Sequence, residues 1–381
     1  MDRIVWLIIV SLGIFILIYL YLRVYHKYIF RAIRLTLLRG RKTSSIDDYK
    51  YFPVRDIYSV HPSSFPKTDS NDILEIEDAY IGLLGKMDSV AFLVAKDGLL
   101  IFEKYWNGHQ VGTLSNSFSM AKSVVVMLLG CAIKDGFIES LQTNVSDYFP
   151  VYSKGKGSRL TVGDLARMST GMDWQEEYYL PFNVTTQAYY GDQLNKLILG
   201  RKIKEDPGKS FTYLSGNTQL LAMVLSEVLP CTLSEYLTKK IWSPLGMESD
   251  AKWMIDESVG MERAYCCINA TARDFLRLGQ LLLQKGQWDN KIILDEEYVD
   301  LMTRPAFLES PQYGYGLWLD LHYEYPFYMM RGHLGQYVIV IPSMDLVITR
   351  LGKKNAKREV EGKQIPEDVY SYIEGVMSAV S

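Results

Sequence analysis

Residues 118–133, FSMAKSVVVMLLGCAI, place a serine and a lysine three positions apart at the start of an apolar run. The run predicts a helix over residues 120–133, in which Ser119 and Lys122 lie on one face within reach of each other. The helix N-terminus adds oriented N–H groups and a positive dipole end, which favour a neutral amine and stabilise a developing alkoxide. Lys122 can then accept the proton of the Ser119 hydroxyl without a histidine. Taken alone, the spacing of Ser119 and Lys122 also fits an N-cap serine followed by a solvated lysine.

A tyrosine further along the chain suits this chemistry. Residues 211–217, FTYLSGN, end just before an amphipathic helix that the pattern predicts at 220–229. At such a loop-to-helix junction, Tyr213 could point its phenol at the serine–lysine pair and pass a proton to a leaving group. The alternative is ordinary packing, because the chain has 27 tyrosines.

A third segment, residues 332–336, GHLGQ, precedes a strand of alternating apolar residues. A glycine at this position, Gly335, allows a ligand to approach the backbone closely. A backbone N–H near Gln336 could complete an oxyanion hole with the N–H of Ser119. His333 taken alone fits a structural role equally well.

Strand patterns at both ends of the body, with helical patterns between them, indicate one sheet that is split in sequence. Apolar runs at 90–95 and 99–105 flank Lys96-Asp97-Gly98, a strong hairpin signal. The other expected strands are 313–319, 327–331, 336–341 and 346–351, and the expected flanking helices are 72–87 and 366–380. The predicted fold class is α/β (α+β), an antiparallel sheet flanked by N- and C-terminal helices with an inserted all-α domain at about residues 117–304. A ligand is expected in the cleft between the sheet and the insertion.

Residues 118–123, the Tyr213 segment and the His333-x-Gly335 segment together resemble the three motifs of the serine β-lactamase and penicillin-binding-protein superfamily. The likeness is closest to the class C-like branch, which includes esterases, D-amino-acid-releasing peptidases and 6-aminohexanoate-dimer hydrolases. Further matching segments follow in the same order at 160–172, 244–248 and 269–275, and the resemblance covers about residues 75–380.

The resemblance implies a role for each motif residue. Ser119 would be the nucleophile, Lys122 the general base and Tyr213 an acid/base, with acylation and deacylation through an acyl-enzyme. The strand edge at His333-x-Gly335 would hold the acyl group.

Two motif positions depart from the pattern of many β-lactamases and peptidases of this branch. Ser215 stands where they carry the asparagine of Tyr-x-Asn, and His333 stands where they carry the lysine of Lys-Thr-Gly. Loss of that lysine weakens the grip on the substrate carboxylate that β-lactams carry. Because both departures also occur in esterase and oligomer-hydrolase members, we expect an ester or amide substrate rather than efficient antibiotic hydrolysis.

The N-terminal segment predicts a membrane anchor. Residues 4–22, IVWLIIVSLGIFILIYLYL, contain no charge, and as a helix they would span roughly 28 Å, close to the ~30 Å hydrocarbon core. The bulky aromatic exit favours an interfacial anchor over a cleaved signal peptide. Basic residues are concentrated after the span, which favours a cytoplasmic body, whereas the family resemblance favours an extracytoplasmic one. Lys27, Arg31 and Arg34 also have the spacing of a basic amphipathic helix on anionic headgroups.

These patterns divide the chain into three parts. Residues 1–42 form the transmembrane anchor and a basic juxtamembrane segment, 43–71 a linker, and 72–381 the hydrolase domain.

The composition excludes several classes of function. A net charge of −3 gives no reason to expect nucleic acid as a partner. The five histidines show no ligand spacing, and four cysteines, Cys131, Cys231 and the adjacent Cys266 and Cys267, match neither a disulfide framework nor a C-x-x-C metal site. We therefore expect no metal and no cofactor.

The sequence as a whole favours a membrane-anchored serine hydrolase that cleaves an amide or ester of a small molecule or peptide, with the lipid bilayer as a partner of residues 4–22. One alternative is a non-catalytic penicillin-binding-protein-like module that binds a peptide or cell-wall fragment. Another is a membrane-surface scaffold that acts through the basic segment after Leu22. The joint presence of Ser119, Lys122 and Tyr213 favours the enzyme.

Overall fold

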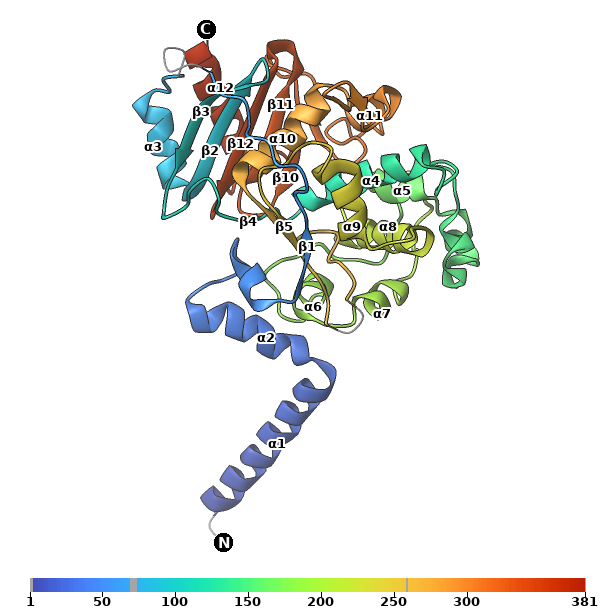
Figure 1. Cartoon of the computed structure of the whole chain (residues 1–381). Coiled ribbons are helices and arrows are strands. Elements are labelled where there is room, and N and C mark those ends of the chain that lie inside the picture. The colour runs from blue at the N-terminus through green and yellow to red at the C-terminus, as the bar shows by residue number, and fades with distance from the viewer. Residues whose placement is uncertain (1–2, 69–73, 258–259, 381) are drawn as a thin grey trace.

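Strands from the two ends of the body pair into a six-stranded antiparallel sheet in the order β3-β2-β12-β11-β10-β9. The structure is a computed structural model that describes residues 3–68, 74–257 and 260–380 (Figure 1). The strands are β2 (Ser89–Lys96), β3 (Leu99–Tyr105), β9 (Trp318–Asp320), β10 (Phe327–Gly332), β11 (Gln336–Ile341) and β12 (Leu346–Gly352). The predicted fold class, an antiparallel α/β sheet that is split in sequence and flanked by N- and C-terminal helices, is confirmed.

Side chains alternate between the two faces of this sheet, and helices cover both faces. Phe92 and Val94 of β2 belong to the cluster beneath α3 (Asp78–Lys86) and α12 (Glu367–Val380). Leu93 on the same strand belongs to the larger core on the opposite face, where α10 (Ala272–Leu283) packs. The alternation of a strand buried on both faces therefore explains why β2 reads as a continuous apolar run.

The hairpin predicted around Asp97-Gly98 is present. Lys96 pairs with Leu99, so the turn has two residues. Asp97 and Gly98 both have positive φ, 51° and 77°, as a tight hairpin turn of this kind requires. The first part of the predicted strand at 313–319 is instead a loop, because Gly316 has a φ of 75°; Tyr313 forms only an isolated bridge with Trp318, where the regular strand begins.

The section at about residues 117–304 was predicted to be all-α, but it also contains short strands. Its helices are α4 (Met120–Lys134), α5 (Val162–Ala166), α6 (Val184–Tyr190), α7 (Leu194–Leu199), α8 (Ser215–Val228), α9 (Leu233–Leu237), α10 and α11 (Glu296–Met302). The same section supplies β5 (Ala251–Met254) and β6 (Ile268–Ala270) to a second sheet, and β7 (Gln287–Trp288) and β8 (Lys291–Ile292) form a small hairpin. Strands this short carry little periodicity, so a sequence pattern does not separate them from loops.

The second sheet has the order β1-β5-β6-β4 and draws its other strands from outside the helical section. These are β1 (Val54–Ile57) and β4 (Ser115–Asn116). Of residues 43–71, predicted as a linker, the described part up to residue 68 packs against the body: β1 pairs with β5, and Ile46 and Phe65 are buried. The predicted boundary at residues 71 and 72, with the start of the predicted 72–87 helix, lies outside the described residues.

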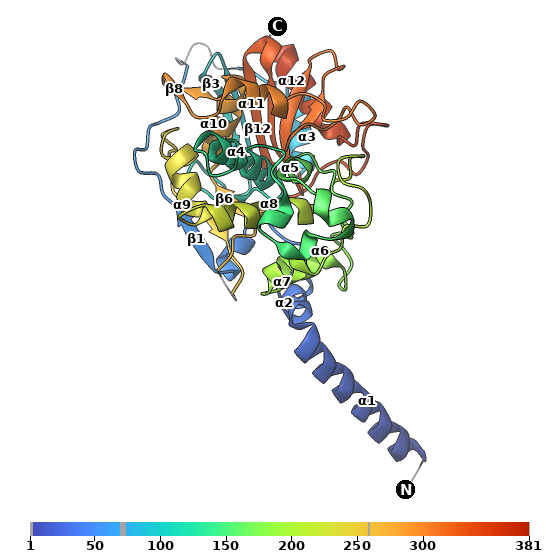
Figure 2. The ribbon, with the colours of Figure 1, turned by 90° about the vertical axis from the view of Figure 1, so that its right-hand side faces the viewer.

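Helix α1 (Arg3–Tyr25) extends away from the body in both views (Figures 1 and 2). None of its residues is buried, and its apolar window has a mean hydropathy of 2.7, so by length and composition it is a candidate membrane span or signal sequence. The next helix, α2 (Lys27–Leu35), is amphipathic, but Arg31 of the predicted basic face is paired with Glu257 of the body, so only Lys27 and Arg34 of that face stay exposed. It directs Ile29 and Leu35 against the body and leaves Ile33 exposed, so only part of its apolar surface remains open.

Candidate active site

Ser119 stands at a tight connection between a strand and a helix. β4 pairs with β6, and the next residue, Ser117, donates its N–H to the Ile268 carbonyl at 2.7 Å. Phe118 then takes a positive φ of 44°, and its N–H is held by the Asn116 side chain at 2.9 Å. This turn places Ser119 at the N-terminus of α4, half-buried, with its side chain at the cleft.

Lys122 lies one helical turn on, beside the serine. Its Nζ is 2.8 Å from Ser119 Oγ and 2.9 Å from the carbonyl oxygen of Tyr265. The side chain is 1% exposed, and burial lowers the pKa of the amine to about 8. The amine also lies 5.1 Å from the centre of the Tyr213 ring. The predicted contact between serine and lysine is thus present in the structure.

Tyr213 approaches the same hydroxyl from the loop before α8. Tyr213 and Ser119 line the same cavity, and the Tyr213 ring packs against Trp318 at 5.2 Å between centroids. Burial raises the pKa of the phenol, so Tyr213 keeps its proton when Lys122 is neutral. Burial thus lowers the pKa of Lys122 and raises that of Tyr213. This suits Lys122 for accepting a proton and Tyr213 for donating one.

Glu176 organises the region around Tyr213 and was missed in the sequence. Its Oε1 accepts from Ser215 Oγ at 2.6 Å and from Tyr178 OH at 2.6 Å, and its Oε2 accepts from the Ser215 N–H at 2.7 Å. Because this carboxylate satisfies the first N–H of α8, the helix begins at Ser215 rather than at the predicted residue 220. Ser215, which the sequence comparison of motifs singled out, therefore faces Glu176.

The 332–336 segment forms the turn between β10 and β11. Its side chains have separate roles. His333 lines the cleft, whereas the buried Gln336 side chain donates to the His333 carbonyl at 2.9 Å and the Gly352 carbonyl at 2.8 Å. Gly335 has a φ of 80°, and a Cβ there would collide with the Arg350 guanidinium. Gly335 and Gln336 are not among the residues that line the cleft. The hydrogen bonds of Gln336 and the close packing at Gly335 hold the turn together.

His333 is enclosed by aromatic rings and stays neutral over the usual pH range. Phe118 and Tyr178 lie 5.5 and 5.1 Å from it between centroids, and its Nε2 is 3.4 Å from Thr43 Oγ1. Burial, followed by the charge of Arg331, lowers the pKa of the imidazole to about 4.

This environment predicts a stability change in mild acid. Between pH 6.5 and 4 the unfolded chain binds a proton at His333 that the folded chain refuses, so stability falls as the pH is lowered through this window. The loss should reach at most on the order of 3 kcal/mol. Denaturant unfolding measures the free energy of unfolding of the wild type and of His333→Asn across this pH range. Subtracting one value from the other removes the contribution of the carboxylates, which titrate in both proteins. A difference between the two that does not change with pH would contradict the prediction.

Two cavities meet at Ser119 and share Ser119, Tyr178 and His333 as walls. The first, which we call the apolar arm, is the narrower of the two. Its other walls include Phe118, Thr185, Thr186, Tyr189, Tyr190 and Cys266. The second, the polar arm, is the wider. Its other walls include Glu176, Tyr213, Trp318, Arg331, Asn355 and Glu359.

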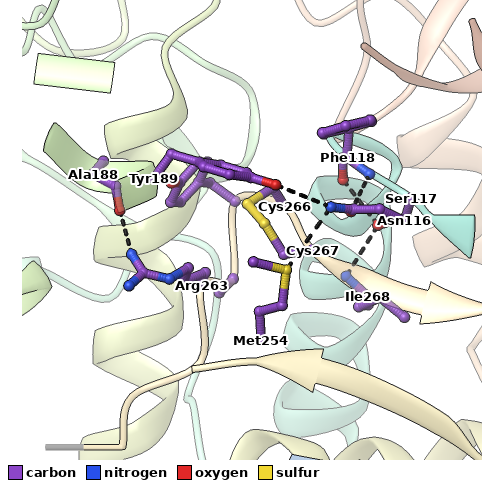
Figure 3. Close-up of a disulfide and its surroundings, with 12 residues drawn as sticks. Asn116, Ser117, Phe118, Ala188, Tyr189, Met254, Arg263, Cys266, Cys267 and Ile268 are labelled. Atoms are coloured by element: carbon purple, nitrogen blue, oxygen red, sulfur yellow. Dashed lines mark hydrogen bonds between the residues drawn. A yellow bond between two sulfur atoms is a disulfide. The ribbon is translucent and has the colours of Figure 1, made fainter. Parts of the chain in front are cut away.

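Cys266 and Cys267 form a disulfide beside the apolar arm (Figure 3). This corrects the interpretation of the four cysteines, because framework spacings describe bridges that join separate segments, whereas this bridge joins neighbours. The preceding residue is Tyr265, whose carbonyl holds Lys122. Cys266 and Cys267 are both buried. Nearby, Asn116 on the strand before Ser119 donates to the Tyr189 hydroxyl at 3.4 Å. In the described chain, no group of three or more His, Cys, Asp or Glu side chains is arranged to hold a metal ion.

Five of the predicted site residues are brought together, namely Ser119, Lys122, Tyr213, Ser215 and His333. The sequence did not reveal Glu176, Tyr178, Tyr265 or Arg331. Glu176 and Tyr178 belong to a short acidic and aromatic stretch, WQEEYY, that has no periodic pattern. Tyr265 contributes its backbone carbonyl, and because every residue has one, the residue type gives no signal for this role.

Comparisons with known proteins concern the family and the fold of this chain. A family model described as Beta-lactamase matches residues 78–367. A curated 6-aminohexanoate-dimer hydrolase of Paenarthrobacter ureafaciens is 26% identical over 220 residues, which are 55% of this chain and 56% of that protein. The match thus spans about half the length of this relative.

Two solved structures have a similar fold. A Bacillus anthracis protein named after the 6-aminohexanoate-dimer hydrolases has a TM-score of 0.73 at 22% identity, covering 90% of this chain and 93% of that one. An octameric penicillin-binding protein homologue from Pyrococcus abyssi has a TM-score of 0.59 at 17% identity, covering 79% of this chain and 76% of its own. At these identities, both likenesses concern the fold.

Proposed function

The chain belongs to the beta-lactamase family and is a serine hydrolase, and from this premise we propose that it is anchored in a membrane and cleaves an amide or ester through an acyl-enzyme on Ser119. The observation that carries the proposal is the 2.8 Å contact between Ser119 Oγ and the Nζ of a buried lysine whose pKa is lowered to about 8. A neutral amine at this distance can take the hydroxyl proton as the serine attacks.

In the proposed acylation step, Ser119 Oγ bonds to the substrate carbonyl carbon while its proton moves to Lys122. Tyr213, which keeps its phenolic proton because burial raises its pKa, gives a proton to the leaving alcohol or amine. The proton on Lys122 then restores the phenol. Water attacks the acyl-enzyme by the same path in reverse and releases a carboxylic acid.

The developing oxyanion needs donors at the end of the cleft. We assign this role to the N–H of Ser119, at the positive end of α4, and to a backbone N–H near Gln336. The Gln336 side chain supports the assignment indirectly, because its hydrogen bonds to the carbonyls of His333 and Gly352 fix the turn that carries this backbone.

The charges of the polar arm bear on the substrate. Arg331 is paired with Glu359, with 2.7 Å between Nη2 and Oε1, and the Glu176 carboxylate lies in the same arm. A substrate carboxylate therefore meets little uncompensated positive charge there. This arrangement favours an ester or amide that carries no carboxylate next to the scissile bond.

Helix α1 would hold this site at a membrane. It is unburied, apolar and long enough to cross the hydrocarbon core, and Tyr19, Tyr21 and Tyr25 near its C-terminal end suit the membrane–water interface.

Replacing Tyr213 by phenylalanine tests the proposed acid. The substitution removes one hydroxyl, keeps the ring packed against Trp318, and should lower kcat for a p-nitrophenyl ester or an anilide by roughly 10²- to 10³-fold. Tyr313→Phe is the matched control, because that buried ring packs 5.9 Å from Tyr213 but lines neither arm. Equal activity in the two variants would exclude Tyr213 as the acid. Binding of such substrates by the wild type without any turnover would instead favour the non-catalytic module.

A further inference from the structure

The two arms of the cleft differ in chemistry. Aromatic rings and threonine methyl groups dominate the apolar arm, whereas the polar arm contains two carboxylates and a guanidinium. Because Ser119 lies where the arms meet, a substrate that fills both has an apolar part on one side of its scissile bond and a polar part on the other. The cleft is thus complementary to an amphiphile.

The wall of the apolar arm is continuous with the segment that follows the span. Helix α6 lines the arm with four of its residues, and α2 packs against α6. Arg31 of α2 donates to the carbonyl of Tyr190, the last residue of α6, at 3.4 Å. Thr43 and Ser44, a few residues beyond α2, also line the arm. The juxtamembrane chain therefore forms part of the pocket itself.

A short loop, residues 178–182, connects the mouth of the cleft to the end of the span, and we call it the rim loop. It begins at Tyr178, which lines both arms, and ends at Phe182, whose ring lies 5.8 Å from that of His26 between α1 and α2. Tyr179, Leu180 and Phe182 are 62%, 57% and 66% exposed. Such a concentration of exposed large apolar side chains marks a surface that is covered in the working state.

The bilayer is the occupant that this position favours. The rim loop contacts the junction at which the proposed span ends, so a membrane around α1 reaches it without rearrangement. Lys27 is exposed beside that junction and Arg34 near the other end of α2, and both suit anionic headgroups. The aromatic side chains of the loop have the character of residues that insert at the interface.

Resting on the proposed hydrolase function, we infer that the substrate is a membrane amphiphile. It is an ester or amide with a long apolar chain, which passes from the lipid surface along the rim loop into the apolar arm while its polar group enters the polar arm. Ser119 breaks the bond between the two parts, releasing an alcohol or amine and, after water attacks the acyl-enzyme, a carboxylic acid.

The test uses the full chain reconstituted in vesicles of phosphatidylcholine and phosphatidylglycerol. Two substrates are compared, soluble p-nitrophenyl butyrate and vesicle-dissolved p-nitrophenyl palmitate. The variant Leu180→Ser/Phe182→Ser changes two side chains that line neither arm. The matched control, Ile292→Ser/Leu308→Ser, removes side chains that are 59% and 90% exposed elsewhere on the body. Ile292 lies on β8, far from α1 in Figure 2.

We expect the rim-loop variant to lose roughly tenfold or more in palmitate turnover, with butyrate turnover and the control variant unchanged. An equal loss on both esters would make the loop a structural element of the site and overturn the inference. Unchanged palmitate turnover would also overturn it, and a simultaneous change of oligomeric state would assign the loop to a second copy of the chain. A wild type inert toward both esters would remove the proposed function itself.

Discussion

Replacing Ser119 by alanine is expected to lower turnover of a p-nitrophenyl ester by roughly 10⁴- to 10⁶-fold. Ser119 is the covalent nucleophile of the proposed mechanism, and alanine cannot form the acyl-enzyme. The loss should appear in kcat, while KM changes little, because the walls of both arms remain in place. Steady-state kinetics with a soluble ester measures both constants.

Ser123→Ala is the matched control for this prediction. Ser123 lies one turn further along α4, is buried, and donates to the Gly316 carbonyl at 2.5 Å without lining either arm. Its loss should cost about 1 kcal/mol of stability and leave kcat within a few fold. If Ser119→Ala retained turnover within tenfold of this control, the hydroxyl of Ser119 would not be the nucleophile.

Replacing Lys122 by methionine should change activity and stability in opposite directions. Methionine keeps the apolar stem but removes the base, so we expect kcat to fall by roughly 10³-fold. At neutral pH the wild type keeps a lysine in a site that disfavours its charge, with a pKa lowered to about 8. Removing this penalty should raise the free energy of unfolding by at most on the order of 3 kcal/mol. The stabilisation from the two hydrogen bonds that Lys122 makes is lost at the same time and reduces this gain.

The pH dependence follows from the same shift. The unfolded lysine titrates near pH 10.4, so between about 8 and that value the unfolded chain binds more protons and the stability of the wild type rises with pH. The base acts in its neutral form, so kcat/KM should rise with pH and level off above about 8. Neither trend should remain in Lys122→Met.

Lys122→Arg separates the two effects. Arginine forces a permanent charge into the same buried position, so both activity and stability should fall. Thermal unfolding of the three proteins at neutral pH gives the comparison. The order Met above wild type above Arg is expected, whereas a less stable methionine variant would mean that pairing stabilises the charge of Lys122 in the folded protein.

Local signals predicted the sheet and its helices well. The Asp97-Gly98 turn, the β11 and β12 strands and the final helix each depend on a few neighbouring residues, and their predicted bounds agree closely with the structure. The second sheet was not predicted. Its strand β4 has two residues, and β1 is stable as a strand only because it pairs with β5, about 200 positions away.

The site divides in the same way. Ser119 and Lys122 were predictable because one helical turn brings them together, and Tyr213 and His333 were found through the motifs they form with that pair. Glu176 lies 39 residues from the Ser215 it holds, and the Tyr265 carbonyl lies 143 residues from Lys122. Contacts of this range depend on the closed fold, and a single sequence carries no local signal for them.

The role of Gln336 illustrates the difference between a position and a side chain. The sequence drew attention to it through the turn that precedes β11, and the structure uses its amide to close that turn onto β12. A pattern of glycines and a strand edge identifies where a backbone is exposed to a ligand. It does not say which way the neighbouring side chains are turned.

The most direct test of the central claim is the mass of a trapped adduct. The full chain is treated with a fluorophosphonate, digested and analysed by peptide mass spectrometry. We expect a single modified peptide that carries the adduct on Ser119, formed faster as the pH rises through about 8 and absent from Ser119→Ala. An adduct on another residue of the cleft, such as Ser215, or undiminished modification of Ser119→Ala, would contradict it.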